Sequence, residues 1–273
     1  SEMCIRDSLG LLKMDFLGLR TLTVIRDAET AVQKHHPEFS IQKLDYDDPE
    51  TYKMLGQGDT EGVFQLESSG MKQVLVGLQP QNLEDVIALI SLYRPGPMDS
   101  IPTYLRNRHE PDKISYKTPQ LAHILDVTNG CIVYQEQVMQ IFRELAGFSF
   151  GQADNVRRAM SKKKHAVMEA EREHFVHGCT EPGHECPGCV ANGIPEQVAN
   201  QIYDEMSSFA SYAFNKSHAA CYAYVAFQTA YLKCHYPSEF MAALLTSVLD
   251  NTDKVIAVSY THLRAHETRG NLV

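Results

Sequence analysis

A lysine and an aspartate stand two positions apart in LLKMDFLGL, the apolar run of residues 11–19. Because alternate side chains of a β-strand point to opposite faces, Lys13 and Asp15 would share one strand face, and the apolar residues the other. Taken alone, the two residues favour an exposed face with a weak ion pair. They also suit a shared polyanion, which the lysine would contact directly and the aspartate through a metal ion.

Two arginines and three lysines with no acid lie in RRAMSKKKH, residues 157–165. Arg157 and Arg158 follow Asp154, which we expect to cap a helix, and a helix N-terminus with guanidinium donors suits phosphate oxygens. A solvated basic helix face explains the two arginines equally well. The lysines suit either a DNA phosphate backbone or solvent; they are Lys162, Lys163 and Lys164.

The stretch FNKSH, which precedes a long apolar segment, is a weaker candidate for nucleotide binding. Lys216 and His218 could reach phosphate or template, although a capped helix start accounts equally well for Asn215 and Ser217. Arg94 lies in the RPGP turn, and we expect it to hold that turn rather than to line a nucleotide path.

A candidate zinc site lies in CTEPGHECPGC, which begins at Cys179. Cys186 and Cys189 form a C-x-x-C pair, with His184 close by, and zinc takes four such ligands tetrahedrally. All four ligands would come from one short loop, without the second distant pair that makes a zinc motif strong. The alternative, which we favour, is a cysteine-bearing surface loop between two helices.

The bulk composition is that of a globular chain with one or two domains. The 273 residues are 44% hydrophobic and carry a net charge of −9, which argues against a protein that mainly holds nucleic acid. Seven scattered cysteines and the lack of an export signal predict a cytoplasmic protein. The longest apolar tract, residues 219–232, falls short of the ~20 residues of a membrane span, so no membrane partner is expected.

Helical periodicity dominates the chain. Apolar residues recur at helical spacing over 20–33, and Asn82 is placed to cap a helix over 83–93. Pro237 would separate the last two helices, and Ser238 would cap the final one. The further predicted helices are 138–148, 155–160, 165–175, 195–210, 217–235 and 238–249.

Sheet is predicted only in the first half of the chain. Residues 11–19 form one expected strand, and the β-branched run at 130–134 a second. The expected fold class is therefore α+β, mostly α-helical. Residues 1–8 and 258–273 lack periodicity of either kind, and we interpret them as non-native tails without a functional role.

Seven stretches, in matching order, give the chain a resemblance to a known family. They are KMDFLGLRTLT (13–23), GVFQLESSGMK (62–72), SLYRPGPM (91–98), YQEQVMQI (134–141), ADNVRRAMSKKK (153–164), FNKSHAACYA (214–223) and HYPSEFMAA (235–243). Together they resemble the alpha, or catalytic, subunit of bacterial DNA polymerase III, a C-family replicative polymerase. The resemblance covers roughly residues 9–257.

The resemblance implies a palm domain with three metal-binding aspartates, followed by a fingers domain that grips the incoming nucleotide. Asp15 is the counterpart of the third aspartate, and the Pro-Asp-x-Asp-x-Asp segment with the first two is missing. Residues 9–20 would end the palm, and residues 21–257 would form the fingers. The family usually has a variable loop where the cysteine-rich stretch lies here.

Polymerisation is attack of a primer 3′-hydroxyl on the α-phosphorus of a dNTP, which two Mg²⁺ ions about 3.5 to 4 Å apart can stabilise. The resemblance implies that Asp15 binds magnesium and that Lys13, Arg157 and Arg158 contact the triphosphate. The implied partners are primer–template DNA, dNTPs, and a sliding clamp and clamp loader that dock outside this fragment, in the bacterial cytoplasm. One carboxylate cannot hold two metal ions, so the fragment alone is expected to be inactive.

The alternative is a non-catalytic helical nucleic-acid-binding module, stabilised by zinc or not, in which Asp15 is structural.

Overall fold

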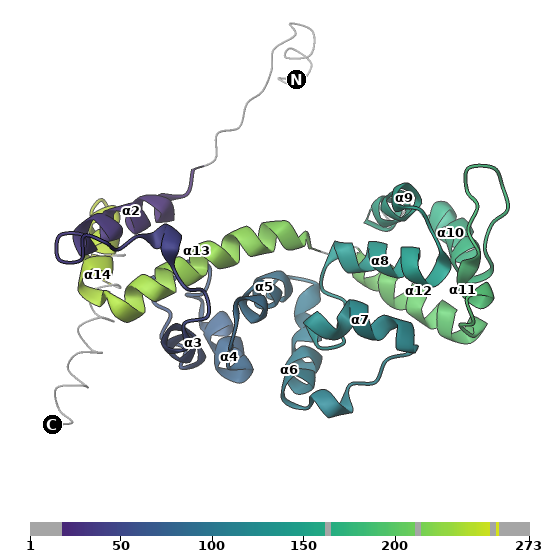
Figure 1. Ribbon diagram of the computed structural model, residues 1–273, viewed down its shortest axis with the longest axis horizontal. Helices are drawn as coiled ribbons and strands as arrows, with labels where there is room; N and C mark the ends of the chain where they lie inside the picture. The colour runs from purple at the N-terminus through teal and green to yellow at the C-terminus, as the bar shows by residue number, and fades with distance from the viewer. Residues whose placement is uncertain (1–17, 162–164, 211–213, 252–254, 257–273) are drawn as a thin grey trace, which may run out of the picture. The chain divides into compact units, whose positions relative to one another are not determined.

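The computed structural model describes residues 18–161, 165–210, 214–251 and 255–256. Over these ranges the chain forms thirteen α-helices and five short 3₁₀ helices, with isolated backbone bridges in place of strands (Figure 1). The mostly helical prediction is therefore confirmed. The strand expected at 11–19 lies outside the described residues, except for Gly18 and Leu19.

The strand predicted at residues 130–134 is wrong. Gly130 adopts a φ of 77°, and of the run only Tyr134 forms a backbone bridge, a parallel one to Phe214. A β-branched run needs a neighbouring strand to pair with, and within the described residues the run has only this single bridge. The run is a connector whose apolar side chains Val133 and Tyr134 are buried.

Contacts divide the chain into two units, which are described separately. The first joins the residues before Lys43 to those from Tyr236 onward, and in it α2 (Arg20–Val32) packs on α14 (Pro237–Ser247). The predicted cap at Ser238 is wrong, because α14 begins one residue earlier at Pro237 and has no side-chain cap. Proline suits this first helical position, where its missing N–H costs nothing.

The second unit, Lys43–His235, contains the other α-helices. They are α3 (Pro49–Gly56), α4 (Ser69–Leu78), α5 (Leu83–Leu92), α6 (Ile101–His109), α7 (Ala122–Leu125), α8 (Gln135–Ala146), α9 (Phe150–Ser161), α10 (His165–His177), α11 (Gly188–Ala191), α12 (Glu196–Ala210) and α13 (Lys216–His235). The 3₁₀ helices are Ile41–Lys43, Pro97–Ser100, Pro111–Lys113, Pro119–Leu121 and Asp126–Thr128.

Two hydrophobic clusters hold the second unit together. In the first, α13 runs alongside α3 and α5 (Figure 1) and buries a face of alanines that lets the helices approach closely. The second cluster is built by α7 to α12 around Phe142, Phe175 and Tyr203. No helix within the described ranges combines the length and the apolar character that crossing a bilayer requires.

Local capping explains where two of these helices begin. The predicted cap of α5 is confirmed, since the Asn82 side chain accepts the Asp85 N–H at 3.0 Å. The predicted cap of α9 is wrong: this helix begins at Phe150, four residues before Asp154. Ser149 and Gln152 form a reciprocal capping box there, with backbone-to-side-chain distances of 2.7 and 3.3 Å, and this earlier start prevails.

Candidate nucleotide-binding site

A pocket of about 460 Å³ lies between α8, α9 and the residue that precedes α13. Three of the seven sequence motifs, YQEQVMQI, ADNVRRAM and FNKSHAA, contribute to its walls. The lining combines charged and amide side chains with the apolar Met139 and Phe150, and consists of Gln135, Glu136, Met139, Gln140, Arg143, Glu144, Phe150, Asp154, Arg157 and Asn215. Of these residues, the sequence predicted only Arg157 and Asn215 as site residues. Gln135 and Glu136 were not predicted, although they lie in the family motif YQEQVMQI.

Backbone contacts bring the distant motifs together. The Gln135 N–H donates to the Phe214 carbonyl at 3.0 Å, beside the parallel bridge from Tyr134. The Lys216 N–H donates to both carboxylate oxygens of Glu136, at 3.1 and 3.2 Å. An acidic residue in the first turn of α8 therefore satisfies a free N–H at the start of α13, although the two lie 80 positions apart.

Arg157 is the most firmly held cation of the pocket. Its Nε and Nη2 donate to Asp154 Oδ1 at 3.0 and 2.7 Å, and its Nη1 donates to Gln135 Oε1 at 2.9 Å. A guanidinium has five N–H donors, so two remain for a ligand. The side chain is 22% exposed, which leaves it accessible but restricts its motion.

Arg158 shares the same carboxylate, with its Nε 2.8 Å from Asp154 Oδ2, but 65% of its side chain is exposed. Hydrogen bonding from Arg157 holds the pKa of the Asp154 carboxyl below its ordinary value. Asp154 thus shares its single negative charge between two guanidinium groups, while the pocket lining as a whole holds two arginines, Arg143 and Arg157, and three carboxylates. Both arginines lie beyond the first turn of α9, so the expected help from its N-terminus is wrong.

The three candidates of the FNKSH stretch point in different directions. Asn215 lines the pocket, and its Oδ1 also caps α13 by accepting the His218 N–H at 2.9 Å. The Lys216 ammonium lies 2.9 Å from Glu84 Oε2 and faces the Tyr134 ring. Only Asn215 therefore joins Arg157 in one pocket.

His218 lines a different pocket of about 380 Å³, together with Arg94, Tyr93, Phe214 and Tyr222. The Arg94 guanidinium carbon lies 4.0 Å from the Phe214 ring centre, and its Nε donates to the Ser91 carbonyl at 3.0 Å. The second contact holds the turn, as the sequence indicates. The sequence analysis did not find that Arg94 also lines a pocket with the FNKSH stretch.

Comparison with known proteins assigns the family. Residues 21–183 match the model of the bacterial DNA polymerase III alpha subunit finger domain. The chain belongs to this polymerase III alpha family. The DNA polymerase III subunit alpha of Thermus aquaticus is 50% identical over 255 residues, which cover 91% of this chain and 20% of that protein. That of Bacillus subtilis (strain 168) is 46% identical over 255 residues, covering 93% and 22%. That of Staphylococcus aureus (strain COL) is 46% identical over 249 residues, covering 91% and 22%.

This polymerase III alpha chain spans about a fifth of the length of the relatives it matches. The two palm candidates, Lys13 and Asp15, lie outside the described residues, and so do the candidate DNA-binding lysines, Lys162, Lys163 and Lys164. Their roles stay predictions. The family match does support Mg²⁺ as the metal of the full enzyme.

The cysteine-rich stretch folds as a hairpin in this member of the family. Cys179 and Cys186 exchange two backbone hydrogen bonds of 2.9 Å, and Cys189 is buried at the start of α11. Burial raises the pKa of the Cys189 thiol to about 12. Across the described ranges, no three of Cys179, His184, Cys186 and Cys189 offer ligand atoms within 4.8 Å of one another. The predicted zinc site is not assembled in this arrangement and stays a prediction.

Proposed function

We propose that the pocket around Arg157 and Asn215 binds the triphosphate of an incoming dNTP. The chain would then be the fingers, with the end of the palm, of a DNA-directed DNA polymerase that extends a primer 3′-hydroxyl. The observation that carries this proposal is Arg157 itself. It is held by Asp154 and Gln135 with two donors left over, and it lines a pocket built from three family motifs.

The bonding of Arg157 suits phosphate recognition. An arginine already fixed by hydrogen bonds loses little further side-chain freedom when a ligand arrives, and its planar fork matches phosphate oxygens. Arg158, mostly exposed beside it, adds a second cation that can turn toward the ligand. Asn215 contributes an amide to the same pocket, whereas Lys216 and His218 would act on the nucleotide only after leaving their present contacts.

The remaining chemistry belongs to residues 9–20 and to parts of the parent outside this chain. Asp15 would bind one or both Mg²⁺ ions with two upstream aspartates, and Lys13 would meet the same triphosphate. The lysines after α9 would contact the phosphate backbone of primer–template DNA. A sliding clamp and clamp loader would dock on regions outside this chain.

A binding measurement tests the pocket. Calorimetric titration of the 273-residue chain with dATP and Mg²⁺ is expected to give an affinity that Arg157→Ala weakens roughly 10- to 100-fold, as for loss of a charge-assisted hydrogen bond. Arg172→Ala is the matched control, because Arg172 is comparably half-buried (26% exposed) and bonded to Asp204 but does not line the pocket. Equal dATP affinities for Arg157→Ala and Arg172→Ala would show that the triphosphate does not bind in this pocket.

A primer-extension assay tests whether catalysis needs the palm residues that lie outside this chain. With primer–template, dNTPs and Mg²⁺, the chain alone is expected to yield no product, because one palm carboxylate cannot hold two ions. Binding of primer–template without any dNTP binding would instead favour the non-catalytic module.

A further inference from the structure

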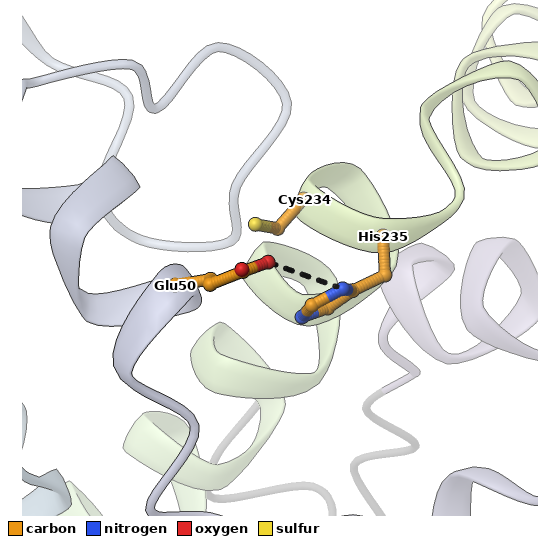
Figure 2. A group of neighbouring side chains, drawn as sticks. All are labelled: Glu50, Cys234 and His235. Atoms are coloured by element: carbon orange, nitrogen blue, oxygen red, sulfur yellow. Dashed lines mark ion pairs between the residues drawn. The ribbon is translucent and has the colours of Figure 1, made fainter.

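A group of metal-ligand side chains lies where the end of α13 meets the start of α3. Glu50, Cys234 and His235 offer a carboxylate oxygen, a thiol sulfur and an imidazole nitrogen that all lie within 4.8 Å of one another. Figure 2 shows the Cys234 sulfur and the His235 ring converging with the Glu50 carboxylate. We propose that these three residues bind a divalent cation of the zinc class and so tie α3 to α13.

The hydrogen bonds of His235 prepare its ring for a metal. Its Nε2 lies 2.9 Å from Asp48 Oδ2, while its Nδ1 lies 3.9 Å from Glu50 Oε2. In the neutral imidazole, a proton on Nε2 donated to Asp48 leaves the lone pair of Nδ1 pointing at the other two ligands. Metal-bound histidines typically donate their second N–H to a carboxylate in this manner, which fixes the tautomer and the ring orientation.

Asp48 is itself fixed by the helix that it begins. It is the N-cap of α3, and the oxygen that contacts His235 also accepts the Thr51 N–H at 2.9 Å. A carboxylate held by both a backbone N–H and an imidazole cannot turn away without uncapping the helix. Asp48 is therefore a positioning residue rather than a ligand.

Thr51 packs against the same group of side chains. It is fully buried, and its hydroxyl lies beside both the half-buried Cys234 thiol and the Asp48 carboxylate. A metal-bound thiolate at Cys234 would be a stronger acceptor for this hydroxyl than the neutral thiol is.

The ligand set selects the metal. One nitrogen, one sulfur and one oxygen suit zinc, whereas magnesium and calcium take oxygen ligands. Tetrahedral zinc with bonds of 2.0 to 2.3 Å separates its ligands by about 3.5 Å. The three ligand atoms lie within 4.8 Å of one another, and His235 Nδ1 and Glu50 Oε2 are 3.9 Å apart, so the group must contract by about 1 Å at most. The Glu50 side chain is 77% exposed and free to make this movement. Three protein ligands leave a fourth position for water.

Titration of the chelator-treated 273-residue chain with Zn²⁺ or Co²⁺ tests the proposal. All variants carry Cys179→Ser, Cys186→Ser and Cys189→Ser, which removes the hairpin cysteines as a competing source of binding. This background is expected to bind one Zn²⁺, show a cobalt–thiolate absorption band and gain thermal stability with the metal. Adding Cys234→Ala is expected to abolish the band and weaken zinc binding at least ~100-fold, since a ligand is lost and second-shell changes alone cost 10- to 100-fold.

Cys221→Ala, at an exposed position of the same helix, is the matched control and is expected to bind as the background does. Asp48→Asn separates positioning from folding, because asparagine caps a helix as well as aspartate does but offers the imidazole a neutral acceptor in place of a carboxylate. We expect about 10-fold weaker metal binding, with the cap of α3 and the metal-free fold retained. Zinc binding that survives Cys234→Ala, or no binding in the background, would overturn the proposal and leave an ion pair of His235 with two carboxylates.

Discussion

The neighbouring residues Phe214 and Asn215 line two different pockets, and each pocket holds an arginine in its own way. Arg157 is fixed at its edges by a carboxylate and an amide, which direct its N–H donors. Arg94 stacks its face on the Phe214 ring, and its Nε donates to the Ser91 carbonyl in its own turn. The side chains that hold Arg157 line the same pocket and direct its remaining donors there, whereas Arg94 is held by its own turn and by an aromatic ring. The pocket of Arg157 therefore suits phosphate, and the structural contribution of Arg94 depends on Phe214.

The largest expected effect in this comparison is on stability. Phe214→Ala removes the ring under Arg94 and its contact with the first hydrophobic cluster of the second unit. We expect a loss of about 2 to 4 kcal/mol in the free energy of unfolding, somewhat below the range for a fully buried phenylalanine. Urea denaturation followed by circular dichroism measures it.

Phe150 is the matched control for this substitution. It lines the other pocket but is 64% exposed, with Arg143 at 5.9 Å from its ring. Phe150→Ala is expected to change stability by less than about 0.5 kcal/mol. Equal losses for the two phenylalanines would contradict the structural role assigned to Phe214.

The next effect separates the two arginines by ligand binding. Arg94→Ala is expected to leave the affinity for dATP within about twofold, because its guanidinium lines the aromatic pocket, whereas Arg157→Ala weakens that affinity roughly 10- to 100-fold. Calorimetry on both variants at one salt concentration gives the ratio. An Arg94→Ala loss as large as that of Arg157→Ala would show that the two pockets act as one nucleotide site.

Asn215 allows a smaller and sharper test, because it both caps α13 and lines the pocket of Arg157. Asn215→Ala is expected to cost about 1 kcal/mol of stability through loss of the cap. Asn215→Asp keeps the cap but places a negative charge beside the triphosphate. We expect wild-type stability with weaker dATP binding, measured by denaturation and calorimetry. Wild-type dATP affinity in Asn215→Asp would place the triphosphate elsewhere.

The sequence predicted the elements whose local signals agree. The helix after Asn82 is one case, since its cap, its apolar stripe and the following RPGP turn all indicate the same boundaries. The start of α9 is the opposite case. Asp154 has the residue type of a cap, but the Ser149 and Gln152 box begins five residues earlier, and Asp154 bonds to the two arginines instead. A local signal cannot reveal which of two competing caps prevails.

The site was predicted in part for the same reason. Arg157 and Asn215 could be selected from residue type and family motif, and they do share a pocket. The partners that orient them, Gln135 and Glu136, could not, because their role depends on a backbone contact with Phe214 some 80 residues away. The group of Glu50, Cys234 and His235 escaped notice because its members are separated by more than 180 positions. Hydrophobic periodicity predicts single helices and strands, and it does not predict which distant residues come into contact.

The smallest effect is the response of the two pockets to acid. Asp154 has a pKa below its ordinary value in the folded chain, while in the unfolded chain it titrates at about 3.9. Its contribution to stability is therefore complete above that unfolded value and is lost as the pH falls through the folded pKa. We expect the difference in urea midpoint between wild type and Asp154→Asn to shrink between about pH 5 and pH 3. The pocket of Arg94 has no carboxylate among its lining residues, so the difference for Arg94→Gln should stay constant over this range. If both differences shrink by the same amount, acid destabilises the whole second unit, and the ion pair of Asp154 with Arg157 makes no separate pH-dependent contribution.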